Sequence, residues 1–420
     1  MSEATQKGLV PELRFPEFRD VGEWEVGTLG DKNVSTFVKE RTSLEKLKLE
    51  NYVSTENLLP DFSGVTTASK LPPTGSFTRF KKGDILISNI RPYLKKVWTA
   101  NKDGASSNDV VVIRAQSKVS DSFLSFLLKN DEFINYIMKG AKGVKMPRGD
   151  ISLMKEYPIA LPNTDEQQKI ADCLSSIDEL VTAQTQKVEA LKAHKKGLMQ
   201  QLFPAEGETV PKLRFPEFRD AGEWEEQPLK KVFTIFQGFA FSSNDSANEG
   251  VRWLKIADVS IQQMNPSAPS YLPIDHKEKY AKFSVKQGDY VIALTRPILN
   301  MQLKIAPVDK VFDGALLNQR VGKLVTAQNI AFVYFLLQTS KVISDIDKSI
   351  SGSEPPNLSA QQIEEIKTYI PSEKEQQKIA DCLSSIDNLI TNETQKLNTL
   401  KAHKKGLMQQ LFPVVDGIDA

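Results

Sequence analysis

The side chains with the clearest chemical potential in this sequence are cations that border short apolar runs. Lys81 and Lys82 precede the β-branched run at 84–90, and Arg91 and Lys95 follow it. Lysine and arginine bind phosphate oxygens, arginine can hydrogen-bond guanine through two donors, and asparagine or glutamine can do the same with adenine. These clusters therefore predict contact with a polyanion. The alternative, an ordinary solvated surface, is the better explanation for any one cluster alone.

A second set of cations and amides occupies corresponding places later in the chain. Arg296 stands eight residues after Gly288, as Arg91 stands eight residues after Gly83. The Gly-rich stretch at 139–150 adds cations on flexible backbone that can approach phosphates. Two sets at matching places are stronger evidence than one. The residues expected to contact nucleic acid are Lys81, Lys82, Asn89, Arg91, Lys95, Lys142, Lys145, Arg148, Arg296, Lys304, Asn318, Gln319 and Arg320.

Motifs for common active sites are missing from the sequence. We find no Gly-x-x-x-x-Gly-Lys-Ser/Thr phosphate loop, no Gly-x-Gly-x-x-Gly after a strand, and no Asn-Pro-Pro-aromatic run of the amino-methyltransferase kind. Three scattered histidines and two cysteines 209 positions apart have no metal-site spacing. Asp275 with Lys277 or Glu278 is a spacing common in charged loops, so it does not predict a nuclease. We expect no catalytic residue, no metal and no cofactor on this chain.

Composition is ordinary for a globular protein, but the charge is unevenly distributed. The net charge is +1, yet residues 26–160 hold 21 Lys and Arg against 14 Asp and Glu. Residues 226–370 hold 16 against 14, so the excess of cations is clear only in the first block. Two cysteines indicate no disulfide framework, and no apolar run is long enough to span a membrane. The polar start is no signal peptide, and we expect a cytoplasmic protein without membrane contact.

Two long, nearly identical segments organise the chain. Residues 166–204 recur at 375–413 with 32 of 39 positions identical. Each segment lacks Pro until its end, and Asn163 or Thr164 can cap the first with Glu166 or Gln167 downstream. At 1.5 Å per residue each segment predicts a helix about 55 Å long.

Apolar residues recur in both segments with the 4–3 spacing of a coiled coil, so we expect the two helices to pair. Polar residues interrupt the seam at Gln184 and Lys195, and at Glu393 and Lys404. A parallel pair would bring the two lysines together in a buried seam, so an antiparallel pair is predicted. The alternative is that each helix packs on its own domain. The seam residues are Ile170, Leu174, Ile177, Val181, Val188, Leu191, Leu198 and Leu202, and Ile379, Leu383, Ile386, Ile390, Leu397, Leu400, Leu407 and Leu411.

A short repeated motif and a variable block precede each long segment. The motif VPELRFPEFRDVGEWE at 10–25 returns at 210–225 with two conspicuous changes, Glu12 to Lys212 and Val21 to Ala221. Trp24 and Trp224 are expected to anchor packing. Strands are predicted at 84–90 and 109–113, a helix at 121–138, and a last apolar run at 157–161; a matching helix is predicted at 330–346. Both blocks therefore predict one α+β fold carried twice, with diverged surfaces.

This arrangement resembles the DNA-specificity (S) subunit of type I restriction-modification enzymes. The resemblance rests on the duplicated EQQKIADCLSSID…LKAHKKGLMQQLFP, the duplicated LRFPEFRD/GEWE motif, and a Gly-Asp–strand–Arg-Pro pattern in each block. It implies two α+β target recognition domains, each reading half of an asymmetric, bipartite double-stranded DNA site, separated by two long helices that pair antiparallel in a pseudo-twofold repeat. It also implies a non-catalytic subunit that assembles with two modification (methyltransferase) subunits and with restriction (translocase/nuclease) subunits. Those partners use S-adenosylmethionine, ATP and magnesium.

The resemblance sets the expected domain boundaries. The first target recognition domain covers 1–160, with its motif at 10–25, and the first spacer helix covers 161–204. The second target recognition domain covers 205–370, with its motif at 210–225, and the second spacer helix covers 371–413, leaving a tail at 414–420. A competing hypothesis is a two-headed protein-interaction scaffold that does not bind DNA.

Overall fold

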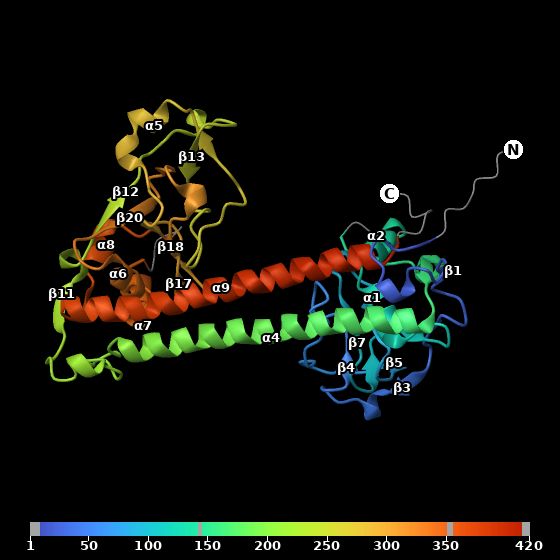
Figure 1. Cartoon of the computed structure of the whole chain (residues 1–420). Helices are drawn as coiled ribbons and strands as arrows, with labels where there is room; N and C mark the ends of the chain where they lie inside the picture. The colour runs from blue at the N-terminus through green and yellow to red at the C-terminus, as the bar shows by residue number, and fades with distance from the viewer. Residues whose placement is uncertain (1–8, 142–144, 351–355, 414–420) are drawn as a thin grey trace. The chain divides into compact units, whose positions relative to one another are not determined.

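The computed structural model describes residues 9–141, 145–350 and 356–413, which divide into two units (Figure 1). Unit 1 contains the residues up to Thr185 together with those from Gln395 onward, and unit 2 contains Gln186–Thr394. Each unit therefore holds one variable block, the first part of one long helix and the last part of the other. Lys142 and part of the loop at 349–357 lie outside the described residues.

The long segments are the helices α4 (Thr164–Leu202) and α9 (Glu373–Leu411). The Asn163 side chain accepts a hydrogen bond from the backbone N–H of Glu166 at 2.9 Å, which caps the start of α4 as expected. The Ser372 hydroxyl accepts from the Glu375 N–H at 3.4 Å in the second copy. The described part of the chain includes no helix both long enough and apolar enough to cross a membrane.

Contacts inside each unit confirm that α4 and α9 pair in opposite directions. In unit 1, Lys404 near the end of α9 forms an ion pair with Asp178 in the first part of α4. In unit 2, Lys195 near the end of α4 forms the equivalent pair with Asp387 at 2.6 Å. Each seam lysine thus meets a carboxylate instead of another lysine. Every predicted seam side chain is buried or half-buried.

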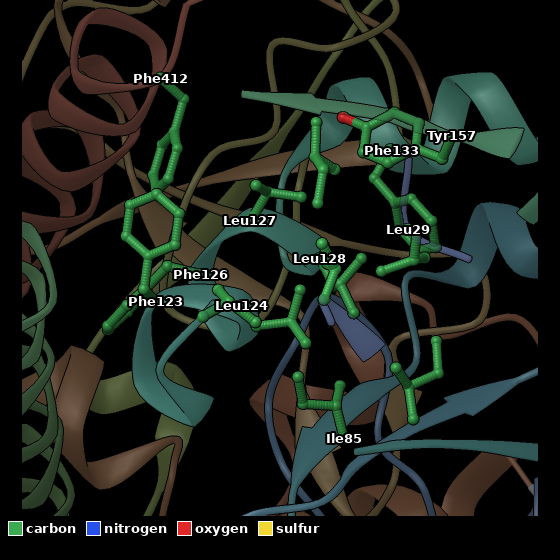
Figure 2. Packing of buried hydrophobic residues seen from close by; sticks show 14 of the residues in the cluster. Leu29, Ile85, Phe123, Leu124, Phe126, Leu127, Leu128, Phe133, Tyr157 and Phe412 are labelled. Carbon is green, nitrogen blue, oxygen red and sulfur yellow. The ribbon is translucent and has the colours of Figure 1, made fainter. Parts of the chain in front are cut away.

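A four-stranded antiparallel sheet forms the centre of unit 1. Its strands follow the order β2-β9-β6-β7. Helices α1 and α2 pack on one face, and Figure 2 shows Ile85 of the sheet in the same cluster as Leu124 and Leu128 of α1. Phe412, just after α9, contacts Phe123 with ring centroids 5.4 Å apart. The elements are β2 (Ser35–Phe37), β9 (Val110–Ala115), β6 (Ile85–Ser88), β7 (Val97–Thr99), α1 (Asp121–Leu128) and α2 (Asp131–Lys139).

Smaller elements complete unit 1. A second sheet has the order β3-β5-β8-β4, and β1 pairs with β10 to close the block near the start of α4. The elements are β1 (Glu25–Thr28), β3 (Arg41–Ser43), β4 (Tyr52–Val53), β5 (Ser76–Phe80), β8 (Gly104–Ser106), α3 (Ile151–Glu156) and β10 (Pro158–Leu161).

Unit 2 repeats this scaffold with different surface residues. Its central sheet has the order β12-β20-β15-β18, and a smaller sheet has the order β14-β13-β19. The central strands are β12 (Thr234–Gln237), β20 (Val321–Val325), β15 (Tyr290–Ala293) and β18 (Ile305–Pro307). The other strands are β11 (Glu225–Pro228), β13 (Val251–Leu254), β14 (Tyr271–Leu272), β16 (Ile298–Leu299), β17 (Gln302–Leu303), β19 (Leu316–Leu317) and β21 (Lys367–Ile370). The helices are α5 (His276–Lys279), α6 (Ile330–Leu336), α7 (Ser340–Ile350) and α8 (Ala360–Glu364).

One sequence prediction about helices was wrong in both units. The helix expected at 121–138 is two helices, α1 and α2, and the helix expected at 330–346 is α6 and α7. Asn130 stops the first run because its side chain accepts a hydrogen bond from the Glu132 N–H at 3.2 Å and caps a new helix. The apolar periodicity continues across this break, so periodicity alone could not show it.

Candidate nucleic-acid interface

One end of the central sheet in unit 1 gathers most of the predicted residues of the first block. Strands β6 and β9 are antiparallel, so the end of β6 lies beside the start of β9. The Asn89 N–H donates to the Asp109 carbonyl at 2.8 Å, and the Gly149 N–H donates to the Asn89 carbonyl at 3.0 Å. We call this region the unit 1 edge; it comprises Asn89–Lys95, Asn108, Asp109 and Lys145–Gly149.

The corresponding end of the sheet in unit 2 has the same construction. The Leu294 N–H donates to the Arg320 carbonyl at 2.8 Å, and the Gln319 N–H donates to the Phe239 carbonyl at 2.9 Å. Lys304 directly precedes β18, which pairs with β15. We call this region the unit 2 edge; it comprises Gln237–Phe239, Thr295–Lys304, Asn318–Arg320 and Pro356–Asn357.

An arginine in a left-handed backbone conformation stands at each edge. Arg91 has a φ of 51° and Arg296 a φ of 48°. Residues other than glycine pay a free-energy cost at positive φ, so such positions cluster where function needs them. The Arg91 N–H donates to the Pro147 carbonyl and the Arg296 N–H to the Pro356 carbonyl, each at 2.8 Å. This shared bond holds both arginines in the same place on the two scaffolds.

The candidates differ in what their side chains already bind. Lys95 forms an ion pair with Asp131 at 2.6 Å, and Arg148 forms one with Asp109 at 3.1 Å. The Lys304 ammonium donates to the Ile256 carbonyl at 3.1 Å, and burial lowers the pKa of Lys304. The exposed candidates are Lys81, Lys82, Lys145, Arg148, Arg296 and Arg320.

Amide side chains at both edges keep hydrogen-bonding capacity. Asn318 uses its side-chain oxygen to accept from the Arg320 N–H at 3.0 Å, which shapes the loop. The side-chain oxygens of Asn89 and Gln319 and the Nε of Arg91 are buried and meet no partner among the described residues. Buried polar atoms are nearly always satisfied, so a bound water, or a ligand that rearranges the edge, would satisfy these three atoms.

Two predicted residues lie away from the unit 1 edge. Lys81 and Lys82 occupy the turn before β6, at the opposite end of that strand from Asn89 and Arg91. The Lys81 N–H donates to the carboxylate of Asp84 at 2.8 Å. The sequence already places these lysines before the strand and Arg91 after it, and the structure confirms that β6 separates them.

The sequence reasoning missed two groups of residues. The first is apolar side chains exposed at the unit 2 edge, Leu299 and Met301, which are 50% and 63% exposed. The sequence offered little indication of their exposure, because apolar residues are normally expected to be buried. The second group is a buried ion pair in each unit, Arg14 with Glu166 and Arg214 with Glu375. The sequence feature that could have revealed this ion pair is that the arginine and the glutamate both recur at equivalent positions of the two repeats.

The arrangement has the features of a surface that binds a ligand. Among the described residues, no group of three or more His, Cys, Asp or Glu side chains is placed to hold a metal ion. Cations, amides and apolar side chains converge at each edge, and these are the groups that contact phosphates and base edges.

The comparison with family models identifies two matched regions in this chain. The model described as "Type I restriction modification DNA specificity domain" matches residues 22–193 and again residues 221–402. Each match covers one variable block and most of the long helix that follows it.

Relatives and solved structures match most of the chain's length. The type I restriction enzyme MjaVIII specificity subunit of Methanocaldococcus jannaschii is 30% identical over 95% of this chain and 93% of its own length. The type I restriction enzyme EcoAI specificity subunit of Escherichia coli is 28% identical over 56% of this chain and 38% of its own. The crystal structure of an S subunit from M. genitalium shares the fold with a TM-score of 0.60 at 18% identity, covering 97% of this chain and all of the other.

Proposed function

Because the chain belongs to the family of type I restriction-modification DNA specificity subunits, we propose that it is the non-catalytic subunit that gives such a complex its DNA sequence specificity, each unit reading one half of an asymmetric, bipartite site. The observation that carries this proposal is the double family match, over two units with the same scaffold and different edges. A single chain with two different DNA-binding edges suits a DNA site whose two halves differ in sequence.

The long helices have two proposed roles in the complex. We propose that α4 and α9 set the gap between the two half-sites, because their antiparallel seam makes a stiff pair. The nearly identical helix ends and short motifs are proposed to bind two modification subunits, with restriction subunits joining the assembly. S-adenosylmethionine, ATP and magnesium are expected on those partners, in the cytoplasm where the DNA lies.

The edges are the proposed base-reading surfaces. Arg91, Asn89, Arg148 and Lys145 would read or position one half-site, and Lys95 would need to leave Asp131 to contact DNA. Lys81 and Lys82 remain candidates for phosphate contact only. In unit 2 the corresponding candidates are Arg296, Lys304, Asn318, Gln319 and Arg320.

The decisive experiment maps methylated DNA motifs. The chain is expressed with its modification subunits in a host without other methylation, and methylated bases are located by single-molecule sequencing. We expect one bipartite motif, and exchange of residues 26–160 for another block should change one half of it and keep the other. A change in both halves would refute the assignment of one unit to one half-site.

Binding measurements separate this function from a protein-interaction scaffold. The assembled complex should bind duplex DNA with an affinity that falls steeply as salt rises, because Lys and Arg displace counterions from phosphates. A complex with no salt-dependent DNA binding would favour the scaffold.

Arg91→Ala and Arg296→Ala should each lower the affinity of the complex for DNA by about ten-fold, through the loss of contacts with one half-site. Lys102→Ala, an exposed cation at the other end of the unit 1 sheet, is the matched control.

A further inference from the structure

A β-hairpin projects from the unit 2 edge between Arg296 and Lys304. Strand β16 (Ile298–Leu299) pairs with β17 (Gln302–Leu303) across a two-residue turn of Asn300 and Met301. Leu299 is 50% exposed and Met301 63% exposed, whereas Leu303 at the base is 1% exposed. The hairpin therefore has a buried base and an apolar tip in solvent.

The base of this hairpin is held firmly by hydrogen bonds. The Lys304 N–H donates to the Pro297 carbonyl at 2.7 Å, which closes the hairpin on the side of the sheet. The Lys304 ammonium donates to the Ile256 carbonyl, and the Arg296 N–H donates to the Pro356 carbonyl. A tip carried on such a base is pre-positioned, as a recognition element should be.

The turn retains a methionine where folding would favour glycine. Asn300 and Met301 have φ values of 50° and 56°, the pattern of a type I′ turn, in which both central residues have positive φ. Asparagine tolerates this conformation, but a side chain such as methionine pays for it in folding free energy. Because Met301 is 63% exposed, it recovers little of that cost through burial. The cost points to a use outside the folded chain.

The surroundings of the tip suit a polyanion. No Asp or Glu occurs between Thr295 and Lys304, and both ends of the hairpin carry a cation. Arg320, exposed on the neighbouring loop, bonds through its carbonyl to Leu294 directly before this segment. An apolar tip on a base flanked by cations, in a segment without acidic residues, is poorly suited to a hydrophobic protein groove and well suited to DNA.

Unit 1 presents a shorter version of the same feature. Tyr93, 49% exposed, stands between Arg91 and Lys95, both of which have positive φ. No acidic residue occurs from Ile90 to Val97. The same place on both scaffolds thus exposes a large apolar side chain among cations, with a different side chain in each unit.

We propose that the β16–β17 hairpin enters the major groove of the half-site read by unit 2, where Met301, supported by Leu299, recognises a thymine through its 5-methyl group. A two-stranded ribbon fits the major groove, and the thymine methyl is the apolar group on the base edges there. This inference rests on the proposed function, and it names the element and the chemistry of recognition.

The test uses the full chain assembled with its modification subunits and duplexes carrying its mapped site. Each thymine of the unit 2 half-site is replaced singly by deoxyuridine, which removes only the methyl group. At one position the wild-type complex should lose about four-fold in affinity. Met301→Gly should lose a similar factor on the thymine duplex and show no further loss with deoxyuridine.

Two further variants keep the result interpretable. Met301→Gly should unfold at the same temperature as wild type or higher, since glycine relieves the positive φ. Met301→Asn, which also tolerates that conformation, should repeat the binding loss, and Val311→Ala, an exposed apolar control in unit 2, should bind normally. Full deoxyuridine discrimination in Met301→Gly, or none in wild type, overturns the inference. A wild-type complex without any site preference overturns the proposed function along with it.

Discussion

At the scale of residues, a buried carboxylate ties each short motif to the start of its long helix. Arg14 donates two hydrogen bonds of 2.7 Å to Glu166, and Trp24 Nε1 donates a third at 3.3 Å. Arg214, Glu375 and Trp224 repeat this arrangement in unit 2. Glu166 is 1% exposed, so its charge depends on these donors.

Removing the arginine should therefore lower the stability of the folded chain. Arg14→Ala leaves the Glu166 charge buried without its partner and should lower the free energy of unfolding by about 3–5 kcal/mol. Denaturant titration of the full chain measures this loss. Arg19→Ala, an exposed arginine of the same motif, should change stability by less than about 0.5 kcal/mol. Equal effects of the two substitutions would show that the buried pair has no special role.

Lys129 should make the free energy of unfolding depend on pH. Burial, aided by the neighbouring Lys404 charge and opposed by Asp178, lowers the pKa of Lys129 to about 8 from its usual 10.5. Between these values the unfolded chain binds more protons than the folded chain, so stability should rise as pH increases from about 8 to 10.5. Because the side chain is only partly shielded, the rise should be about 1–2 kcal/mol.

A matched variant isolates this titration. Gln338 occupies the position in unit 2 that corresponds to Lys129. Lys129→Gln should therefore fit the scaffold, raise stability at pH 7 and abolish the alkaline rise in thermal unfolding scans. A variant that keeps the full rise would assign it to another group.

At the scale of elements, the two long helices depend on lysines placed in their apolar seam. Lys195 is 5% exposed, forms an ion pair with Asp387, and lies 5.3 Å from the centre of the Phe335 ring. Lys404 lies 5.5 Å from the Phe126 ring in unit 1. Each lysine therefore links the helix pair to the first helix of a block, α6 or α1.

Double-mutant cycles test this pairing. We expect Lys195 and Asp387 to show a coupling energy of about 1–2 kcal/mol, and Lys404 with the more exposed Asp178 to show about 0.5–1 kcal/mol. Lys195 with Asp178, on one helix and far apart, should show none. Absence of coupling in both cross-helix pairs would contradict the antiparallel alignment.

At the scale of the whole molecule, one scaffold is used twice and each unit is completed by both long helices. The final residues of α9 pack into the core of unit 1, and those of α4 pack into the core of unit 2. The backbone of Leu13 bonds to Gln410, and Leu213 bonds to Gln201, each at 2.9 Å. A unit is thus built from segments far apart in the sequence.

Lengthening both helices should alter only the gap in the DNA site. Seven residues inserted after Thr185 and seven after Thr394 keep the seam in phase and add about 10 Å, or about three base pairs. Sequencing of methylated motifs should find the same half-sites with a wider gap. Four-residue insertions, which shift the seam, should impair assembly. An unchanged gap after the seven-residue insertions would refute the spacer role.

The sequence by itself determined the repeats, the α+β class, the two long helices and their direction, and the family. These properties depend on local periodicity, on identity between distant segments, and on two charges that cannot share a buried seam. Tertiary structure decided the rest. The break at Asn130 is a side-chain hydrogen bond that periodicity does not register, and the partners of Arg14 and Lys195 lie more than 150 residues away. The exposure of Met301 depends on its place in the two-residue turn of a hairpin, which apolar character alone does not reveal.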